Sequence, residues 1–191
     1  VGVHLGAGVE AFDDGDDAVA VVLKDGTRLS ADLVVLAIGV QPDTAFLEGS
    51  GIVRSERGAI RVDPHMRTSD EFVYAVGDAV EVQDFVTGRP VHVPLAGPAN
   101  RQGRIAADAI AGLNRAYRHT QGTAICKVFD QTIGVTGLNE KTAVAHDIPY
   151  RKSYTHSSSN AGYYPGAGIL TIKTLFAPDS GRVLGAQVAG S

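Results

Sequence analysis

The chain has 191 residues, of which 44% are hydrophobic and 20% are charged, as in an ordinary globular protein. Its 17 Lys and Arg against 21 Asp and Glu give a net charge of −4, which argues against a broad nucleic-acid-binding surface. No apolar run approaches the ~20 residues that span a bilayer, so we expect no membrane-spanning segment. The single Cys leaves no intrachain disulfide, CxxC pair or Cys-rich zinc site, and it favours a reducing, cytoplasmic compartment.

Residues 1–40 predict a three-stranded antiparallel meander that leads into a buried strand. The three strands are expected over residues 3–11, 18–23 and 28–31, with an acidic turn over 13–17. Asp25-Gly26, between the last two strands, is a strong hairpin signal. The run from Asp32 to Gly39 is continuously apolar after its first residue, which is typical of a strand covered on both faces, as in a parallel sheet.

The segment Gly6-Ala-Gly-Val-Glu-Ala11 fits the glycine-rich pattern of dinucleotide-binding loops. That chemistry needs a helix directly after the glycines, so that helix N–H groups meet the pyrophosphate. Here the acidic turn and another strand follow, and clustered acids repel phosphate. We therefore interpret the match as coincidental.

The middle of the chain predicts two strands and a helix separated by loops. Strands are expected over residues 59–62 and 72–76, the second one buried and ended by Gly77-Asp78. A Pro-rich stretch over 87–98 leads into a helix over about 99–111, for which Gly112 is a suitable cap.

From about residue 122 the pattern changes to strands with one helix. The helix is expected over 139–147 with Asn139 as its N-cap. The five strands are expected over residues 124–129, 133–135, 150–155, 169–175 and 183–188. The order ββαβββ suggests a separate α+β domain with its boundary near residues 118–122. Both ends of the chain resemble strands, so we expect the 191 residues to be part of a longer polypeptide.

Gly77 and Asp78 are the strongest functional candidates. A buried strand would deliver them at its carboxyl end, where open α/β sheets bind ligands. Gly77 would let a ligand approach the backbone, and Asp78 could accept a hydrogen bond from a sugar or ribityl hydroxyl. The alternative is a plain Gly-Asp turn after a strand.

A second apolar run, 33–39, also ends in Ala-x-Gly and is followed by Pro42-Asp43. Together with Thr68-x6-Ala-Val-Gly-Asp78 and the stretch 94–103, it resembles the C-terminal part of the pyridine nucleotide-disulfide oxidoreductases, which are flavoproteins with two dinucleotide-binding domains. The resemblance implies an α/β and α+β fold, in which an incomplete FAD/NAD(P)-binding two-domain remnant is followed by an α+β dimerisation domain. It assigns residues 1–42 to the tail of the NAD(P)H-binding domain, 43–120 to the C-terminal part of the FAD-binding domain, and 121–191 to a truncated dimerisation domain.

The resemblance also implies the cofactors FAD and NAD(P)H and the residues that contact them. Gly77, Asp78 and Ala79 would contact the ribityl chain of the flavin, and Leu95 and Ala96 would lie near its isoalloxazine at the start of a helix. Gly39, in the stretch that closes the NAD(P)H-binding domain, is a further cofactor-binding candidate.

The third segment resembles the subgroup that contains coenzyme A-disulfide reductase and NADH oxidase, and Tyr163-Tyr164-Pro165 is its most distinctive element. The resemblance implies a homodimer formed through residues 121–191, with Tyr163 and Tyr164 as catalytic candidates near the partner subunit's active cysteine. The alternative is that both tyrosines are packing residues at a hairpin.

In the family, the redox cysteine and the two Gly-rich loops precede the part that this chain resembles. Cys126 lies in an expected strand, and we expect it to be a buried, small apolar residue. The six His show no metal-binding spacing, so no metal site is expected. We therefore expect the chain to be part of an FAD-dependent NAD(P)H oxidoreductase, and we expect this part to be inactive when isolated. The acceptor that the whole enzyme reduces would be a disulfide such as coenzyme A disulfide, a persulfide, oxygen or peroxide. The sequence leaves the acceptor and the choice between NADH and NADPH open. The alternative is a non-catalytic oligomerisation fragment.

Overall fold

The computed structural model of the chain describes residues 2–14 and 18–190. They divide into two compact units, residues 1–40 and 41–191, which are considered separately.

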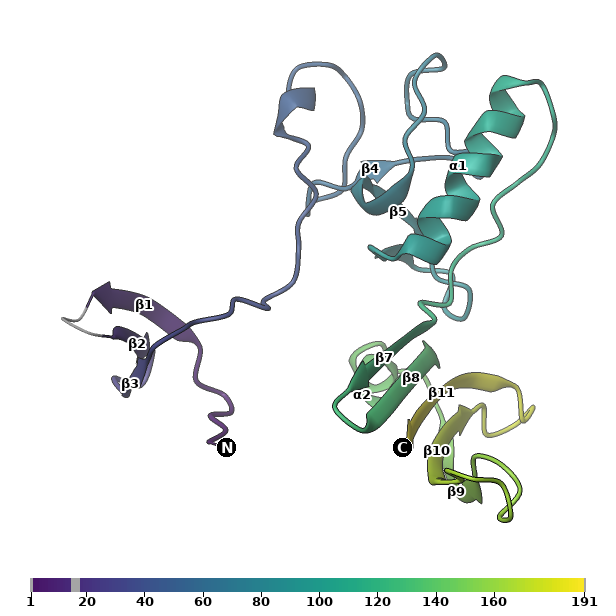
Figure 1. Cartoon of the computed structure of the whole chain (residues 1–191). Helices are drawn as coiled ribbons and strands as arrows, with labels where there is room; N and C mark the ends of the chain where they lie inside the picture. The colour runs from purple at the N-terminus through teal and green to yellow at the C-terminus, as the bar shows by residue number, and fades with distance from the viewer. Residues whose placement is uncertain (1, 15–17, 191) are drawn as a thin grey trace. The chain divides into compact units, whose positions relative to one another are not determined.

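The first unit is an antiparallel meander of the strands β1 (Val9–Asp14), β2 (Val19–Leu23) and β3 (Arg28–Ala31), shown in purple in Figure 1. The Asp25-Gly26 turn joins β2 to β3, and the Leu23 N–H donates to the Thr27 carbonyl at 2.8 Å. The predicted meander is therefore confirmed, although its first strand starts at Val9 rather than near residue 3. A strand follows Gly6 and Gly8, which confirms that no helix follows the glycine-rich match. Residues 15–17 of the predicted acidic turn lie outside the described residues.

The predicted buried strand over residues 32–39 is wrong. The segment has no strand assignment, and the side chains of Leu33 and Ile38 are 80% and 88% exposed. A strand needs a neighbour that satisfies its backbone N–H and C=O groups. No strand among the described residues pairs with this segment, so its apolar residues stay extended and uncovered.

The second unit begins with a small three-stranded sheet covered by a helix. Its strands are β4 (Ile60–Arg61), β5 (Val80–Gln83) and β6 (Pro90–His92), of which β4 and β5 run parallel and β5 and β6 antiparallel. The helix α1 spans Ala96–Ile110, so the predicted helix begins three residues earlier than expected, and short 3-10 turns lie at η1 (Ala45–Leu47) and η2 (Gly77–Ala79). One cluster of buried core residues in this region consists of Met66, Val80, Val82, Ala106 and Tyr117.

The predicted strand over residues 72–76 is also wrong. Only Tyr74 forms an isolated bridge, with Arg67, and Phe72 is 84% exposed. The Asp70 side chain accepts a hydrogen bond from the Phe72 N–H at 2.9 Å, and the Asp70 carbonyl accepts one from the Val73 N–H at 3.1 Å. These local bonds fold the chain into a turn, so the apolar run does not enter a sheet.

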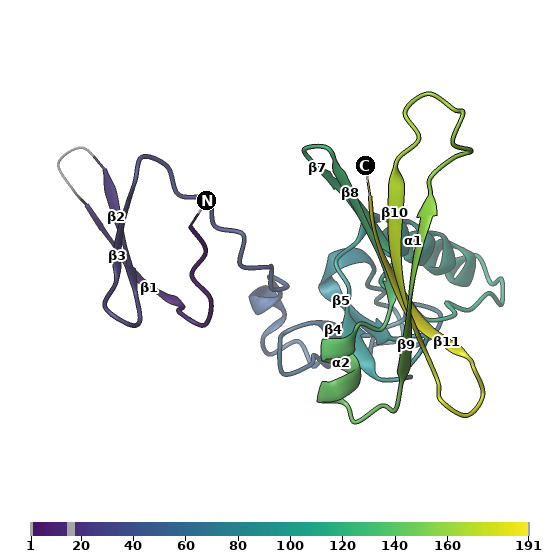
Figure 2. The same cartoon turned by 90° about the horizontal axis from the view of Figure 1, so that it is seen from below.

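The last part of the chain is a five-stranded antiparallel sheet with one helix. The strands are β7 (Ala124–Val128), β8 (Gln131–Gly137), β9 (Arg151–Ser158), β10 (Ile169–Phe176) and β11 (Val183–Gly190), in the order β7-β8-β11-β10-β9 (Figure 2). The helix α2 (Glu140–Ala145) begins after Asn139, whose side chain accepts from the Thr142 N–H at 2.9 Å. Its Ala143 is fully buried against a core of Leu138, Leu175 and Leu184. The predicted order ββαβββ and the predicted N-cap are confirmed.

Cys126 is exposed, which contradicts the expectation of a buried residue. Its strand, β7, is at the edge of the sheet, and among the described strands its one partner is β8. Residues 125–128 of β7 are all exposed, so neither face of this strand is buried there.

Candidate functional site

The three residues expected to contact a ribityl chain form one 3-10 turn, η2. Gly77 has φ of +82°, a left-handed backbone conformation that side chains other than hydrogen disfavour, so this turn requires glycine. A Cβ atom at Gly77 would meet Ala99 at 3.9 Å, an ordinary contact, so the requirement comes from the backbone rather than from space. Asp78 follows with an exposed side chain, available to a ligand.

The two residues expected near an isoalloxazine lie at the start of α1. Leu95 is the N-cap, Ala96 is the first helical residue, and the Leu95 carbonyl accepts the first helical bond, from Ala99, at 3.1 Å. The first N–H groups of a helix lack partners within it, and the helix dipole makes this end partly positive. The exposed backbone of Ala96 and Gly97 therefore favours a negative charge or a hydrogen-bond acceptor.

The structure brings the η2 turn and α1 together. The Gly77 N–H donates to Oε1 of Gln102, on the second turn of α1, at 2.7 Å. On the other side of Asp78, its backbone carbonyl contacts Nε2 of His92, at the end of β6. The sequence patterns did not point to Gln102 or His92. Their partners lie 25 and 14 residues away along the chain, beyond the reach of any local motif.

The remaining candidates lie elsewhere. Gly39 belongs to the first unit, where it is exposed with φ of +91°. Tyr163 and Tyr164 lie in the loop between β9 and β10 and are 90% and 61% exposed. The Ser159 N–H donates to the Gly168 carbonyl at 2.8 Å and closes this loop, so the tyrosines are presented at its tip. The roles assigned to all these residues stay predictions.

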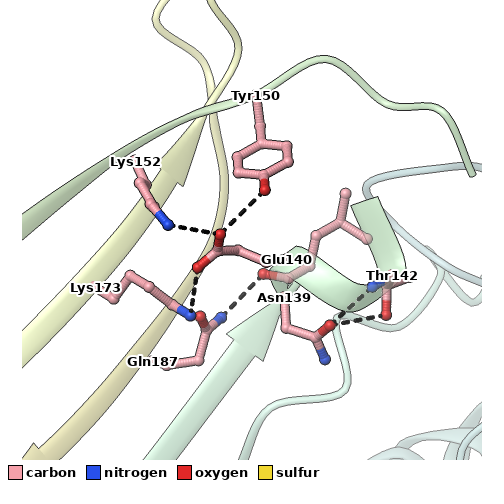
Figure 3. A network of polar contacts seen from close by, with 8 residues as sticks. Asn139, Glu140, Thr142, Tyr150, Lys152, Lys173 and Gln187 are labelled. Atoms are coloured by element: carbon pink, nitrogen blue, oxygen red, sulfur yellow. Dashed lines mark hydrogen bonds and ion pairs between the residues drawn. The ribbon is translucent and has the colours of Figure 1, made fainter. Parts of the chain in front are cut away.

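A second polar cluster ties α2 to the five-stranded sheet (Figure 3). The Glu140 carboxylate accepts hydrogen bonds from Lys152 at 2.8 Å, Tyr150 at 3.0 Å and Lys173 at 3.1 Å. The hydrogen bonds from Lys152 and then Lys173 lower the pKa of Glu140 to about 2, from its ordinary value of 4.5. The bond to Glu140 in turn raises the pKa of Tyr150. Because Glu140 bonds all three of the other side chains, we interpret this cluster as a structural link between α2 and the sheet and call it the brace.

Residues 2–14 and 18–190 contain neither a metal-binding cluster nor a membrane-spanning helix. In that part of the chain, no three His, Cys, Asp or Glu side chains are grouped so as to hold a metal ion. Among its helices, none combines the length and apolarity needed to cross a bilayer.

Comparison with known proteins places these features in a family. Residues 1–103 match the model of the pyridine nucleotide-disulphide oxidoreductases, and residues 123–191 match the model of their dimerisation domain. The chain belongs to the pyridine nucleotide-disulphide oxidoreductase family. The sequence resemblance and the predicted mixed α/β and α+β fold are thereby confirmed.

Its relatives within the pyridine nucleotide-disulphide oxidoreductases include reductases and oxidases. The chain is 37% identical to an NAD(P)H coenzyme A polysulfide/persulfide reductase of Pyrococcus horikoshii over 93% of its own length and 40% of the relative's. It is 36% identical to an NADH oxidase of Methanocaldococcus jannaschii over 92% and 39%. The crystal structure of reduced Bacillus anthracis CoADR-RHD shares 45% identity at a TM-score of 0.89, over 96% of this chain and 33% of that one. The chain thus spans about two fifths of these relatives or less.

Proposed function

We propose that this chain carries the ribityl-contacting turn, the following helix and the dimerisation domain of an FAD-dependent NAD(P)H oxidoreductase. The observation that supports this most is the junction of η2 with α1 in a chain of this family, where the turn that carries an exposed carboxylate is hydrogen-bonded to the second turn of the helix. A bound flavin would supply the redox chemistry, by taking a hydride from NAD(P)H and passing electrons to an acceptor.

The residues present fit the ribityl and isoalloxazine part of such a cofactor. Asp78 would accept hydrogen bonds from ribityl hydroxyls, while Gly77 and Ala79 leave the backbone open to close approach. The start of α1 at Leu95 and Ala96 would lie at the edge of the isoalloxazine, where its partly positive end favours the negative charge of a reduced flavin.

For the rest of the chain we propose the division expected from the sequence. Residues 1–42, with Gly39, would form the tail of the NAD(P)H-binding domain, 43–120 part of the FAD-binding domain, and 121–191 the dimerisation domain of a cytoplasmic homodimer. The match to the family's dimerisation domain supports the last assignment. Exposed apolar residues support it too, since the sheet leaves Ile125, Ile133 and Val135 uncovered at 75%, 42% and 40%.

The acceptor that we propose is a small sulfur compound or oxygen. A relative at 37% identity is named for coenzyme A polysulfide or persulfide, and one at 36% is named NADH oxidase. In either case Tyr163 or Tyr164 would reach the reacting sulfur or oxygen from the partner subunit. The same exposed apolar sheet favours a second candidate, a part that serves oligomerisation without chemistry of its own.

Substitution of Asp78 tests the proposed flavin contact. In the full-length protein that carries this chain, Asp78→Ala should lower the FAD content, because ribityl hydroxyls lose a charged acceptor worth about 1.5–3 kcal/mol. Asp70→Ala is the matched control, since Asp70 is an exposed carboxylate of the preceding turn that bonds the Phe72 N–H. The measurement is the ratio of flavin to protein absorbance after purification. Equal flavin content in both variants would contradict the role proposed for Asp78.

A further inference from the structure

Gln102 is a polar residue on the buried face of α1. Gln102 and Ala106, one turn apart, are the buried residues of this helix, and Gln102 is 2% exposed. Ala106 packs into the apolar core with Val80 and Met66, as expected for that face. A buried amide is costly unless it is hydrogen-bonded, so its presence in this position calls for a specific partner.

The partner of Gln102 is the first N–H of the η2 turn. Val76, just before the turn, is extended with φ of −144°, whereas Gly77 has φ of +82°. This abrupt change of backbone conformation turns the Gly77 N–H away from the hydrogen-bonding direction of an extended strand. The Val76 side chain does not cap the turn. Oε1 of Gln102 accepts that N–H at 2.7 Å, so the glutamine fixes where the turn begins.

His92 holds the same turn one residue later. The pairing of β5 with β6 sets His92 opposite Glu81, two residues after the turn, and its Nε2 contacts the Asp78 carbonyl. Gln102, from α1, therefore binds the peptide group before the Gly77 Cα, and His92, from β6, binds the peptide group after the Asp78 Cα, so the two bonds flank the Gly77-Asp78 pair. These two bonds limit rotation of the backbone that carries the exposed Asp78 carboxylate.

We propose that Gln102 is a positioning residue for the flavin, which acts by holding Asp78 in the orientation that meets the ribityl chain, with His92 as the second support. This inference rests on the proposed function of Asp78. A side chain that already has its binding orientation loses less conformational entropy when the ligand binds. Loss of the Gln102 hydrogen bond should therefore weaken FAD binding, even though Gln102 itself does not touch the cofactor.

The test uses the flavin-free form of the full-length protein and measures the FAD dissociation constant by titration. Gln102→Leu keeps the size of the side chain but removes the acceptor, and it should weaken FAD binding roughly tenfold. Gln83→Leu makes the same chemical change at an exposed glutamine of β5 and should leave binding unchanged.

A double variant separates positioning from simple packing. If Gln102 acts through Asp78, Gln102→Leu should add little further weakening in a protein that already carries Asp78→Ala. The same tenfold loss in both backgrounds would overturn the inference, and so would wild-type binding by Gln102→Leu. If Gln102→Leu does not fold, His92→Leu and His92→Gln take its place, with weaker binding expected only for the leucine, which has no donor.

The outcomes also distinguish this inference from the proposed function. If Asp78→Ala binds FAD as tightly as the wild type, the proposed flavin contact itself fails. If Asp78→Ala weakens binding while Gln102→Leu does not, the flavin contact stands and only the positioning role of Gln102 is refuted.

Discussion

Removal of the aromatic rings of Tyr163 and Tyr164 should weaken a dimer formed through the C-terminal sheet. Tyr163 is 90% exposed in the single chain, so nearly its whole side chain is available to be covered by a partner. Complete burial of a large side chain contributes about 1.5–3 kcal/mol. A two-fold dimer contains the residue twice, so Tyr163→Ala should cost roughly 3–6 kcal/mol, or about 10²–10⁴-fold in the dimer dissociation constant. Tyr164, which is 61% exposed, should cost about two thirds as much.

Sedimentation and turnover of the full-length protein check this reasoning. Tyr163→Phe and Tyr164→Phe retain the ring, so both variants should stay dimeric. Turnover should fall in whichever of them removes a hydroxyl that donates a proton or a hydrogen bond to the reacting group. If both alanine variants dissociate no more readily than the wild type, the tyrosines do not lie in the interface. If both phenylalanine variants keep wild-type turnover, their role is packing alone.

Three further predictions concern stability and the turn at Asp78. Because the folded state lowers the pKa of Glu140 from 4.5 to about 2, its contribution to stability is complete above pH 4.5 and is lost as the pH falls toward 2; Glu140→Gln should reduce this loss, as measured by unfolding midpoints across that range. Leu175 is completely buried, so Leu175→Ala should lower the free energy of unfolding by about 2–5 kcal/mol in a denaturant titration, and a loss below about 1 kcal/mol would show that this core is loosely packed. Gly77→Ala has room for its methyl group but not the favoured backbone, so it should cost roughly 1–2 kcal/mol in the same titration; an unchanged stability would mean that the turn does not hold its left-handed conformation.

The elements that the sequence predicted well are those with strong local signals. The meander of residues 9–31 contains an Asp25-Gly26 turn between alternating strands, and α2 begins at an Asn139 cap. Such signals act over a few residues, so they can be recognised in the sequence without knowledge of the rest of the fold.

The wrong predictions were those that depended on what covers a segment. The apolar runs 32–39 and 72–76 are hydrophobic enough for a buried strand, but hydrophobicity does not reveal whether a neighbouring strand is present to pair with it. Cys126 was expected to be buried for the same reason, yet it lies exposed on a strand at the edge of its sheet.

The candidate site was predictable in part. Asp78 stood out because it ends an apolar run and fits a family pattern, whereas Gln102 and His92 became visible only when the fold brought α1 and β6 to the turn. The brace around Glu140 is similar, because its lysines lie 12 and 33 residues away on two strands. Side-chain bonds over such separations depend on tertiary structure, which a single sequence does not display.

The visible absorption spectrum, with and without NADH, tests the central proposal most directly. The full-length protein that carries this chain should be purified with flavin absorbance that bleaches when NADH or NADPH is added without oxygen. The isolated 191-residue chain should be colourless and should not oxidise NADH, because the ribityl contacts offer only a few hydrogen bonds of about 1–3 kcal/mol each. A full-length protein without flavin absorbance, or a yellow isolated chain, would contradict the account.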